Sequence, residues 1–167
     1  MTWYVRPESF ATPDATQLRR DYYSEVASRW WRRPATEEEI DQGLAESPDD
    51  GLAPPTGEFV VGRLGGAHGE AMACGGLRML DAERAELTRV YVRPAARGSG
   101  GGAALVAALE AAAGRLGARR VVLDTRLDLV EARGLYVKLG FLEIPRYGEP
   151  GPYSEIWYGK ELAAQSA

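Results

Sequence analysis

The residues best suited to chemistry in this sequence form a run of glycines between a strand-like segment and a helical one. Residues 86–92 are rich in β-branched and aromatic side chains, which favour a strand, and Pro94 ends that segment. Arg97 then precedes four glycines in the next five positions. Apolar side chains follow at helical spacing as far as Leu116. We therefore expect the glycines at a strand-to-helix turn.

The chemistry that this turn favours is the binding of an anion. Glycine at three successive positions disfavours a helix start by up to ~1 kcal/mol each relative to alanine, so another requirement must select it. Unpaired N–H groups and the helix dipole attract negative charge at a helix start, and glycine lets an anion approach the backbone closely. Arg97 adds a charge that can pair with phosphate. The pattern predicts a phosphate-bearing cofactor; a flexible surface loop is the alternative that the glycines alone leave open.

Two other phosphate-binding motifs can be weighed at the same stretch. A Walker-type loop requires Lys followed by Ser or Thr after its last glycine, whereas Gly102 precedes Ala103. Residues 98–103 do match the dinucleotide pattern G-x-G-x-x-A, with Asp124 roughly 20 residues further on. However, several residues separate Val92 from the first glycine, and few βα units remain downstream. A dinucleotide-binding domain stays as a lesser alternative.

Two motifs in order resemble the GNAT superfamily of N-acetyltransferases. Arg97-x-x-Gly100-x-Gly102, after a strand that ends in Tyr91-Val92, resembles the family's acetyl-coenzyme A signature. Residues 132–141 resemble its A-x-x-x-Y-x-x-x-G-F helix end. The resemblance covers residues 57–162 and implies the GNAT fold, with acetyl-coenzyme A as cosubstrate and no metal.

The resemblance also implies roles for individual residues. Backbone groups of Val90 and Val92, with Tyr91 between them, would pair with the pantetheine arm as an added strand does. The pyrophosphate would be held along the turn by Arg97, Gly98, Ser99, Gly100, Gly101, Gly102 and Ala103.

Acetyl transfer to an amine requires two proton movements, and the resemblance suggests a residue for each. An alkylammonium with a pKa near ~10.4 must lose a proton before it attacks, and the departing thiolate must gain one. Tyr136 occupies the family's tyrosine position and is the predicted general acid, although an aromatic residue on a helix can equally be core. Glu86 is the predicted base, with a solvated strand-end carboxylate as the alternative. The family's frequent asparagine is replaced by Leu129, which removes a usual orienting hydrogen bond.

The elements that would position these residues alternate in a recognisable order. The sequence predicts β-α-α-β-β-β-α-β-α-β-β, an α/β (α+β) fold with a mixed, mostly antiparallel sheet, central splayed parallel strands and flanking helices. The parallel strands would be residues 86–92 and 121–125. The remaining elements are expected at about residues 3–6, 12–31, 36–44, 57–64, 71–80, 102–116, 129–139, 141–144 and 154–162.

Composition narrows the function class further. The chain has 167 residues, which fits a single domain over residues 1–167. Lys and Arg number 20 against 24 Asp and Glu, so nucleic-acid binding has no compositional support. No stretch is apolar enough to span a membrane and the first nine residues are too polar for a signal peptide, so we expect a cytoplasmic protein without a membrane partner. The lone Cys74 and His68 make neither a zinc site nor a Cys–His pair credible.

The acceptor is the least specified part of the prediction. We expect a small-molecule or peptide amine, bound near aromatic residues that include Trp30, Trp31 and Tyr153. Arg32, Arg33 and Arg146 could attract a carboxylate on that acceptor. A homodimer is left open. The leading alternative from another class is a non-catalytic coenzyme A-binding regulatory module that kept the turn and lost its base.

Overall fold

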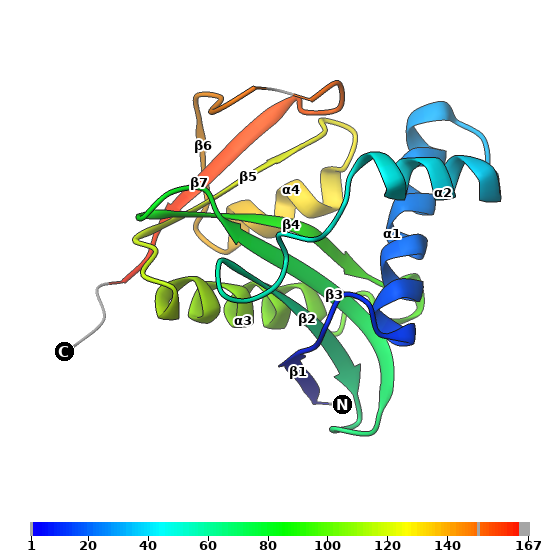
Figure 1. Ribbon diagram of the computed structural model, residues 1–167, viewed down its shortest axis with the longest axis horizontal. Coiled ribbons are helices and arrows are strands. Elements are labelled where there is room, and N and C mark those ends of the chain that lie inside the picture. Colours follow the sequence, from blue (N-terminus) through cyan, green and yellow to red (C-terminus); the bar gives the residue numbers. More distant parts are fainter. Residues whose placement is uncertain (1, 150, 164–167) are drawn as a thin grey trace.

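The strands that the structure describes all belong to one seven-stranded sheet, in the order β1-β2-β3-β4-β5-β7-β6 (Figure 1). The computed structural model describes residues 2–149 and 151–163. Its elements are β1 (Trp3–Pro7), α1 (Pro13–Trp31), α2 (Glu37–Glu46), β2 (Gly57–Leu64), β3 (Glu70–Met79), β4 (Arg84–Val92), a short 3₁₀ turn (Pro94–Ala96), α3 (Gly101–Arg115), β5 (Arg120–Thr125), α4 (Val130–Lys138), β6 (Leu142–Ile144) and β7 (Ile156–Glu161). The predicted order of elements is therefore confirmed, with ends that differ by a few residues.

The sheet opens between β4 and β5, its only parallel pair within the described residues. These strands pair at three positions, from Arg84 opposite Arg120 to Glu86 opposite Val122. Beyond that point β4 continues to Val92 and β5 to Thr125, but the two strands no longer pair with each other. The edges that face the opening therefore keep unpaired backbone groups, and the predicted splayed parallel strands are confirmed.

A β-bulge bends β4 next to this opening. Thr88 lies opposite Gly76 and Tyr91 opposite Cys74, so two residues of β4 face one of β3. The first of the two, Arg89, has a φ of 57°, which is rare for a residue with a side chain. Such a bulge sharpens the bend of a strand and interrupts its ladder of hydrogen bonds. The bulge lies in the part of β4 that no longer pairs with β5.

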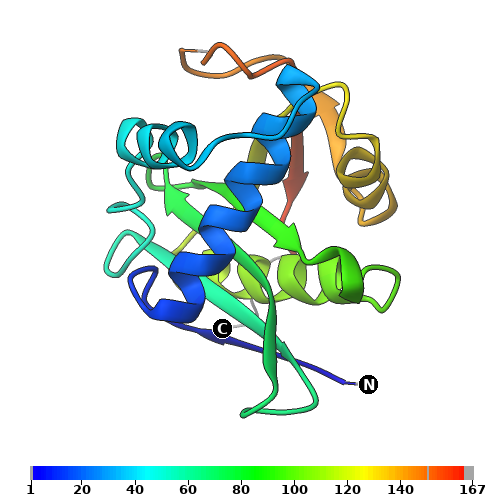
Figure 2. The same ribbon diagram turned by 90° about the vertical axis from the view of Figure 1, so that its right-hand side faces the viewer.

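Helices cover both faces of the sheet (Figures 1 and 2). The apolar residues of α3, which include Leu105 and Leu109, pack with Leu87 and Leu123 in one core cluster. On the opposite face α1 contributes Ala15 and Leu18 to a second cluster. Figure 2 shows α1 crossing the sheet close to the opening. Among residues 2–149 and 151–163, no helix has the length and apolar character required to cross a membrane.

A loop between α2 and β2 fixes the bulge from outside the sheet. Its Asp49 is almost fully buried, and one carboxylate oxygen accepts from Arg89 Nε at 3.1 Å while the other accepts from Arg19 Nη1 at 3.0 Å. The carbonyl of Thr56 accepts from Met79 N, which ties the end of the loop to β3. The strained Arg89 backbone is thus held by a buried ion pair.

Substitution of Gly57 tests this attachment. A Cβ at Gly57 would lie 2.0 Å from the carbonyl oxygen of Gly51 and 2.6 Å from that of Leu77, so Gly57→Ala is expected to destabilise the protein by about 1–3 kcal/mol. Gly134, inside α4, has open space around its Cβ position, so Gly134→Ala should stabilise by up to ~1 kcal/mol. Urea denaturation measures both. Equal effects of the two substitutions would contradict the expected close approach.

Candidate active site

The opening between β4 and β5 continues into a cavity of about 380 Å³. Its walls come from both splayed strands, α1, the end of α2, α4 and the loop before β7. The lining includes Tyr22, Tyr23, Trp30, Leu87, Thr88, Arg89, Val90, Leu123, Asp124, Thr125, Arg126, Ala132, Tyr136, Tyr153 and Ser154. A volume of this size accommodates a small molecule.

Tyr136 lies on the wall of this cavity, as its predicted role requires. Its ring packs against Phe141 and Tyr158, with centroid separations of 5.6 and 6.3 Å. No hydrogen bond to its hydroxyl is found within the described residues, yet that oxygen is not sealed from solvent, so it opens into the cavity. Burial of the ring, with a smaller effect from Tyr22, raises the pKa of Tyr136 and keeps the phenol protonated.

The glycine turn packs against Leu135 of α4 and has more than one reason for its composition. Gly98 and Gly100 have φ values of 82° and 89°, a region that glycine favours. A Cβ at Gly101 would lie 2.5 Å from the ring of Trp3, and one at Gly102 would lie 2.7 Å from Leu135. Anion binding, inferred from the sequence, is therefore not the only requirement for glycine here.

The backbone of this turn nevertheless suits an anion. The first intrahelical bond of α3 runs from Ala104 N to the Gly100 carbonyl at 3.0 Å. Across the described part of the chain, the amides of residues 98–103 find no hydrogen-bond acceptor. These N–H groups lie at the start of a helix, where its dipole also favours negative charge. A pyrophosphate would satisfy donors that the protein leaves unpaired.

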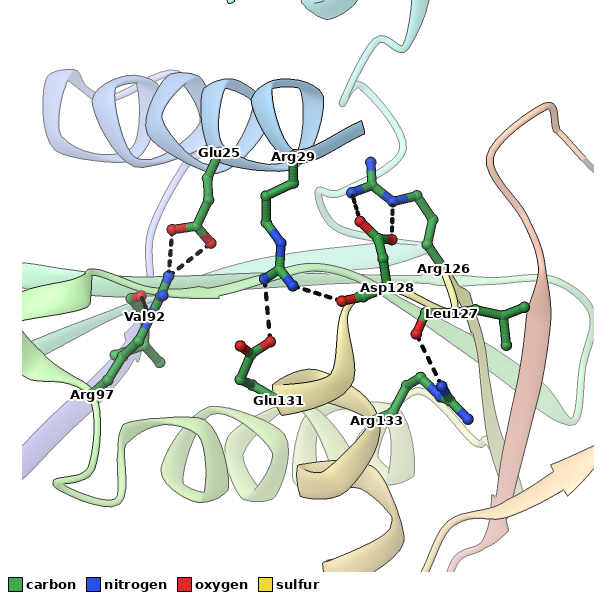
Figure 3. Close-up of polar contacts among 9 residues, drawn as sticks. All are labelled: Glu25, Arg29, Val92, Arg97, Arg126, Leu127, Asp128, Glu131 and Arg133. Atoms are coloured by element: carbon green, nitrogen blue, oxygen red, sulfur yellow. Dashed lines mark hydrogen bonds and ion pairs between the residues drawn. The ribbon is translucent and has the colours of Figure 1, made fainter. Parts of the chain in front are cut away.

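Arg97 is already paired to α1. Its Nη2 donates to both oxygens of Glu25, at 2.7 and 2.8 Å, and its Nε donates to the Val92 carbonyl at 3.0 Å (Figure 3). The sequence predicts that Arg97 binds the cofactor. In this structure Arg97 joins the turn to α1. A phosphate at Arg97 would have to compete with Glu25 for the guanidinium.

Further arginines fasten α1 to the segment between β5 and α4 (Figure 3). Arg126 donates to both carboxylate oxygens of Asp128 at 2.8 Å and to the Val26 carbonyl at 2.6 Å. Arg29 donates to the Asp128 carbonyl at 2.6 Å and to Glu131 at 3.2 Å. One ion pair and two bonds to backbone carbonyls thus join α1 to the segment around Leu129, the position of the family's frequent asparagine.

Glu86 lies beside the opening but is not among the residues that line the cavity. Its buried carboxylate accepts from Arg78 Nε at 3.0 Å and from the Tyr147 hydroxyl at 2.9 Å. Burial, followed by the charge of Glu86, raises the pKa of Tyr147, so that phenol stays protonated and keeps donating. The predicted base therefore has two donors fixing its orientation.

Asp124 is a carboxylate of the cavity for which the sequence suggested no role in acetyl transfer. It follows the buried part of β5 and accepts from the Ser154 hydroxyl at 3.0 Å. Removal of water by the cavity walls raises its pKa, the Ser154 bond opposes that rise, and the charge of Glu86 adds to it. Its position at the end of a predicted parallel strand was the available signal.

The aromatic residues expected around the acceptor are placed in part at the cavity. Trp30 and Trp31 both line it, and Trp30 meets Tyr153 edge to face with centroids 5.1 Å apart. Arg32, Arg33 and Arg146, offered as carboxylate attractors, are not among the lining residues. Arg33 instead binds Glu39 through two nitrogens, at 2.8 and 2.7 Å.

Fold and site together define the class of this protein. A mixed sheet that splays at a single parallel pair, with a glycine turn after the first strand and a tyrosine beside the opening, is the acyl-coenzyme A N-acyltransferase arrangement. The model of the acetyltransferase (GNAT) family matches residues 16–141, and the chain therefore belongs to the GNAT family.

Individual relatives agree with this assignment. The chain is 34% identical over 119 residues to an uncharacterised N-acetyltransferase of Schizosaccharomyces pombe, a match that covers 70% of this chain and 71% of the relative. An acetyltransferase of the GNAT family from Staphylococcus aureus superposes with a TM-score of 0.75 at 16% identity, covering 97% of this chain and 100% of that one. An N-acetyltransferase of Thermoplasma acidophilum in complex with coenzyme A gives a TM-score of 0.71 at 18% identity. The superposition covers 96% of this chain and 99% of that one.

Cys74 is excluded as a nucleophile by its surroundings. It has no exposed surface and is not part of the cavity wall, and its thiol donates to the Arg89 carbonyl at 3.4 Å. Burial raises the pKa of Cys74 to about 12, so the reactive thiolate does not form at neutral pH.

The native protein should therefore not react with a thiol reagent such as 5,5′-dithiobis(2-nitrobenzoate) at pH 8, whereas the unfolded chain should release one equivalent of thionitrobenzoate for its single cysteine. Absorbance at the thionitrobenzoate band measures both. Rapid labelling of the folded protein would contradict the burial of Cys74.

Proposed function

We propose that this protein transfers the acetyl group of acetyl-coenzyme A to a primary amine of a small molecule, amino acid or peptide, by direct attack in a ternary complex. The observation that carries the proposal is the unpaired Tyr136 hydroxyl on the wall of the cavity where β4 and β5 separate. Family membership and the coenzyme A complex of the Thermoplasma acidophilum relative support the choice of cosubstrate. The buried Cys74 favours direct attack over an acyl-enzyme intermediate.

The residues around the opening fit acetyl-coenzyme A. The unpaired amides of residues 98–103 suit its pyrophosphate, and the free edge of β4 near Val90 and Val92 suits the amides of its pantetheine arm. When bound, the thioester supplies an activated acetyl group. The bulge at Arg89 and Val90 interrupts the ladder of β4, so the Val90 N–H is the donor proposed for the oxyanion.

The protein's residues would then move two protons. The amine nitrogen forms a bond to the carbonyl carbon, and the bond from that carbon to sulfur breaks. Glu86 takes the proton of the attacking nitrogen through a water, because its carboxylate is set back from the cavity lining. Tyr136 donates its proton to the departing sulfur, and the raised pKa of Tyr136 keeps that proton in place beforehand.

The sequence left two alternative functions open, and the fold argues against one of them but not against the other. A dinucleotide-binding domain requires a doubly wound parallel sheet, and the described strands here contain one parallel pair. A coenzyme A-binding module without activity shares this fold and differs only in turnover. Kinetics separates that module from an enzyme.

Replacement of Tyr136 by Phe tests the catalytic proposal. The ring contacts with Phe141 and Tyr158 remain, so stability and acetyl-coenzyme A affinity should stay near wild type. Loss of the general acid should lower kcat by about 10²-fold or more, measured as thiol release with an amine panel. Burial raises the pKa of Tyr136, so this phenol should stay protonated up to about pH 10. The wild-type kcat should therefore show no loss from its ionisation at any lower pH. Full turnover by Y136F would leave Tyr136 a purely packing role.

Ligand-dependent thermal unfolding tests the cosubstrate. A ligand that binds only the native state stabilises it by about 2.7 kcal/mol at 100 times its dissociation constant. Acetyl-coenzyme A and coenzyme A should raise the unfolding temperature, and reduced nicotinamide dinucleotide should not. Stabilisation by the nicotinamide cofactor alone would refute the proposal. Stabilisation by coenzyme A without turnover of any amine would identify a non-catalytic module.

A further inference from the structure

The arginines that line the cavity form ion pairs within the protein, whereas the carboxylate of Asp124 does not among the described residues. Arg19 and Arg89 share Asp49, and Arg126 is paired with Asp128. Asp124 has the Ser154 hydroxyl as its hydrogen-bond partner, and no ion pair reaches it within the part of the chain that the structure describes. A second lining carboxylate, Glu46, is exposed at the end of α2 and accepts from Gln42.

Every nitrogen of the three arginines that line the cavity already donates to an oxygen of the protein. In Arg19 the three nitrogens donate to the Phe10 carbonyl, Asp49 and Thr16. The three nitrogens of Arg89 and the three of Arg126 likewise each donate to a protein oxygen. These bonds fix the three guanidiniums but leave two N–H groups on each. A carboxylate next to the ammonium of the acceptor would enter a cavity that already holds the charge of Asp124, and the two negative charges would repel.

The remaining walls of the cavity suit an apolar body that carries a cation. Tyr22, Tyr23, Trp30 and Tyr153 contribute aromatic rings with a large apolar area. The guanidinium of Arg126 already lies over the ring of Trp30, 5.2 Å from its centroid, so the wall receives the apolar body and the cation is left to Asp124. Asp124 shares one face of the sheet with Glu86, because Glu86 pairs with Val122 and side chains alternate along a strand. An ammonium held at Asp124 would therefore lie beside the proposed base.

We propose that Asp124 binds the ammonium group of the acceptor, and that the acceptor is a primary amine on an apolar, preferably aromatic, body without a carboxylate next to the amine. This inference rests on the acetyltransferase function proposed above and names the substrate class for the same site. Asp124 determines specificity by pairing with the cation, and the aromatic wall receives the body. The serine hydroxyl of Ser154 orients the carboxylate.

Matched acceptors test the substrate class on the wild-type protein. Phenethylamine, L-phenylalanine and ethanolamine are compared as acceptors of acetyl-coenzyme A by thiol release. Phenethylamine should have a kcat/KM at least about 10-fold above L-phenylalanine, which adds a carboxylate, and above ethanolamine, which lacks the apolar body. Equal or better use of L-phenylalanine would overturn the inference while leaving the acetyltransferase function intact. Acetylation of no amine would overturn both.

Substitution of Asp124 tests the residue itself. D124N keeps the shape and the Ser154 contact but removes the charge, so the KM for phenethylamine should rise about 10- to 100-fold with a much smaller change in kcat. Glu143→Gln is the control, because it removes the same charge from an exposed residue of β6. It should leave the KM for phenethylamine unchanged. A KM unaffected by D124N, in protein that still binds acetyl-coenzyme A, would refute the role of Asp124.

Discussion

The short parallel pairing of β4 and β5 is the constraint on which the site depends. Pairing stops at Glu86 opposite Val122, and the residues of β4 and β5 proposed to act on a ligand lie at or beyond that point. Paired further, the two strands would bury their backbone donors in each other and close the cavity. The bulge at Arg89 helps to keep them apart, and Asp49 holds it with a buried ion pair. The opening is thus a built feature of the sheet.

Guanidinium groups organise the space around this opening. Arg126 and Arg29 join α1 to the segment after β5, and Arg97 joins α1 to the glycine turn. Most of these pairs are partly buried, where removal of one partner leaves a charge that water solvates poorly. Their other effect is on recognition. The arginines of the cavity wall are bonded within the protein, whereas Asp124 has no ion pair among the described residues, which is why Asp124 is the group proposed to meet the acceptor.

Of the site residues predicted from motif spacing, Val90 and Tyr136 are among those that line the cavity. The spacing in residues 97–102 and 132–141 located the glycine turn and Tyr136, since such motifs combine a local backbone requirement with a side chain at a fixed helical position. The pairing of Glu86 with Arg78 and Tyr147, and the placement of Asp124 on the cavity wall, depend on residues far apart in the chain. No local pattern encodes such contacts.

The sequence by itself determined the order of the elements, the two motifs and the family they indicate. Hydrophobic periodicity and turn residues act over a few positions, and these can be read along the chain. Only the tertiary structure decided that Arg97 pairs with Glu25, that Trp3 and Leu135 also require glycine in the turn, and that Arg33 lies away from the cavity. Charge pairing acts through space and is not restricted to neighbours in the sequence. The packing of strands and helices therefore decides which arginine pairs with which carboxylate.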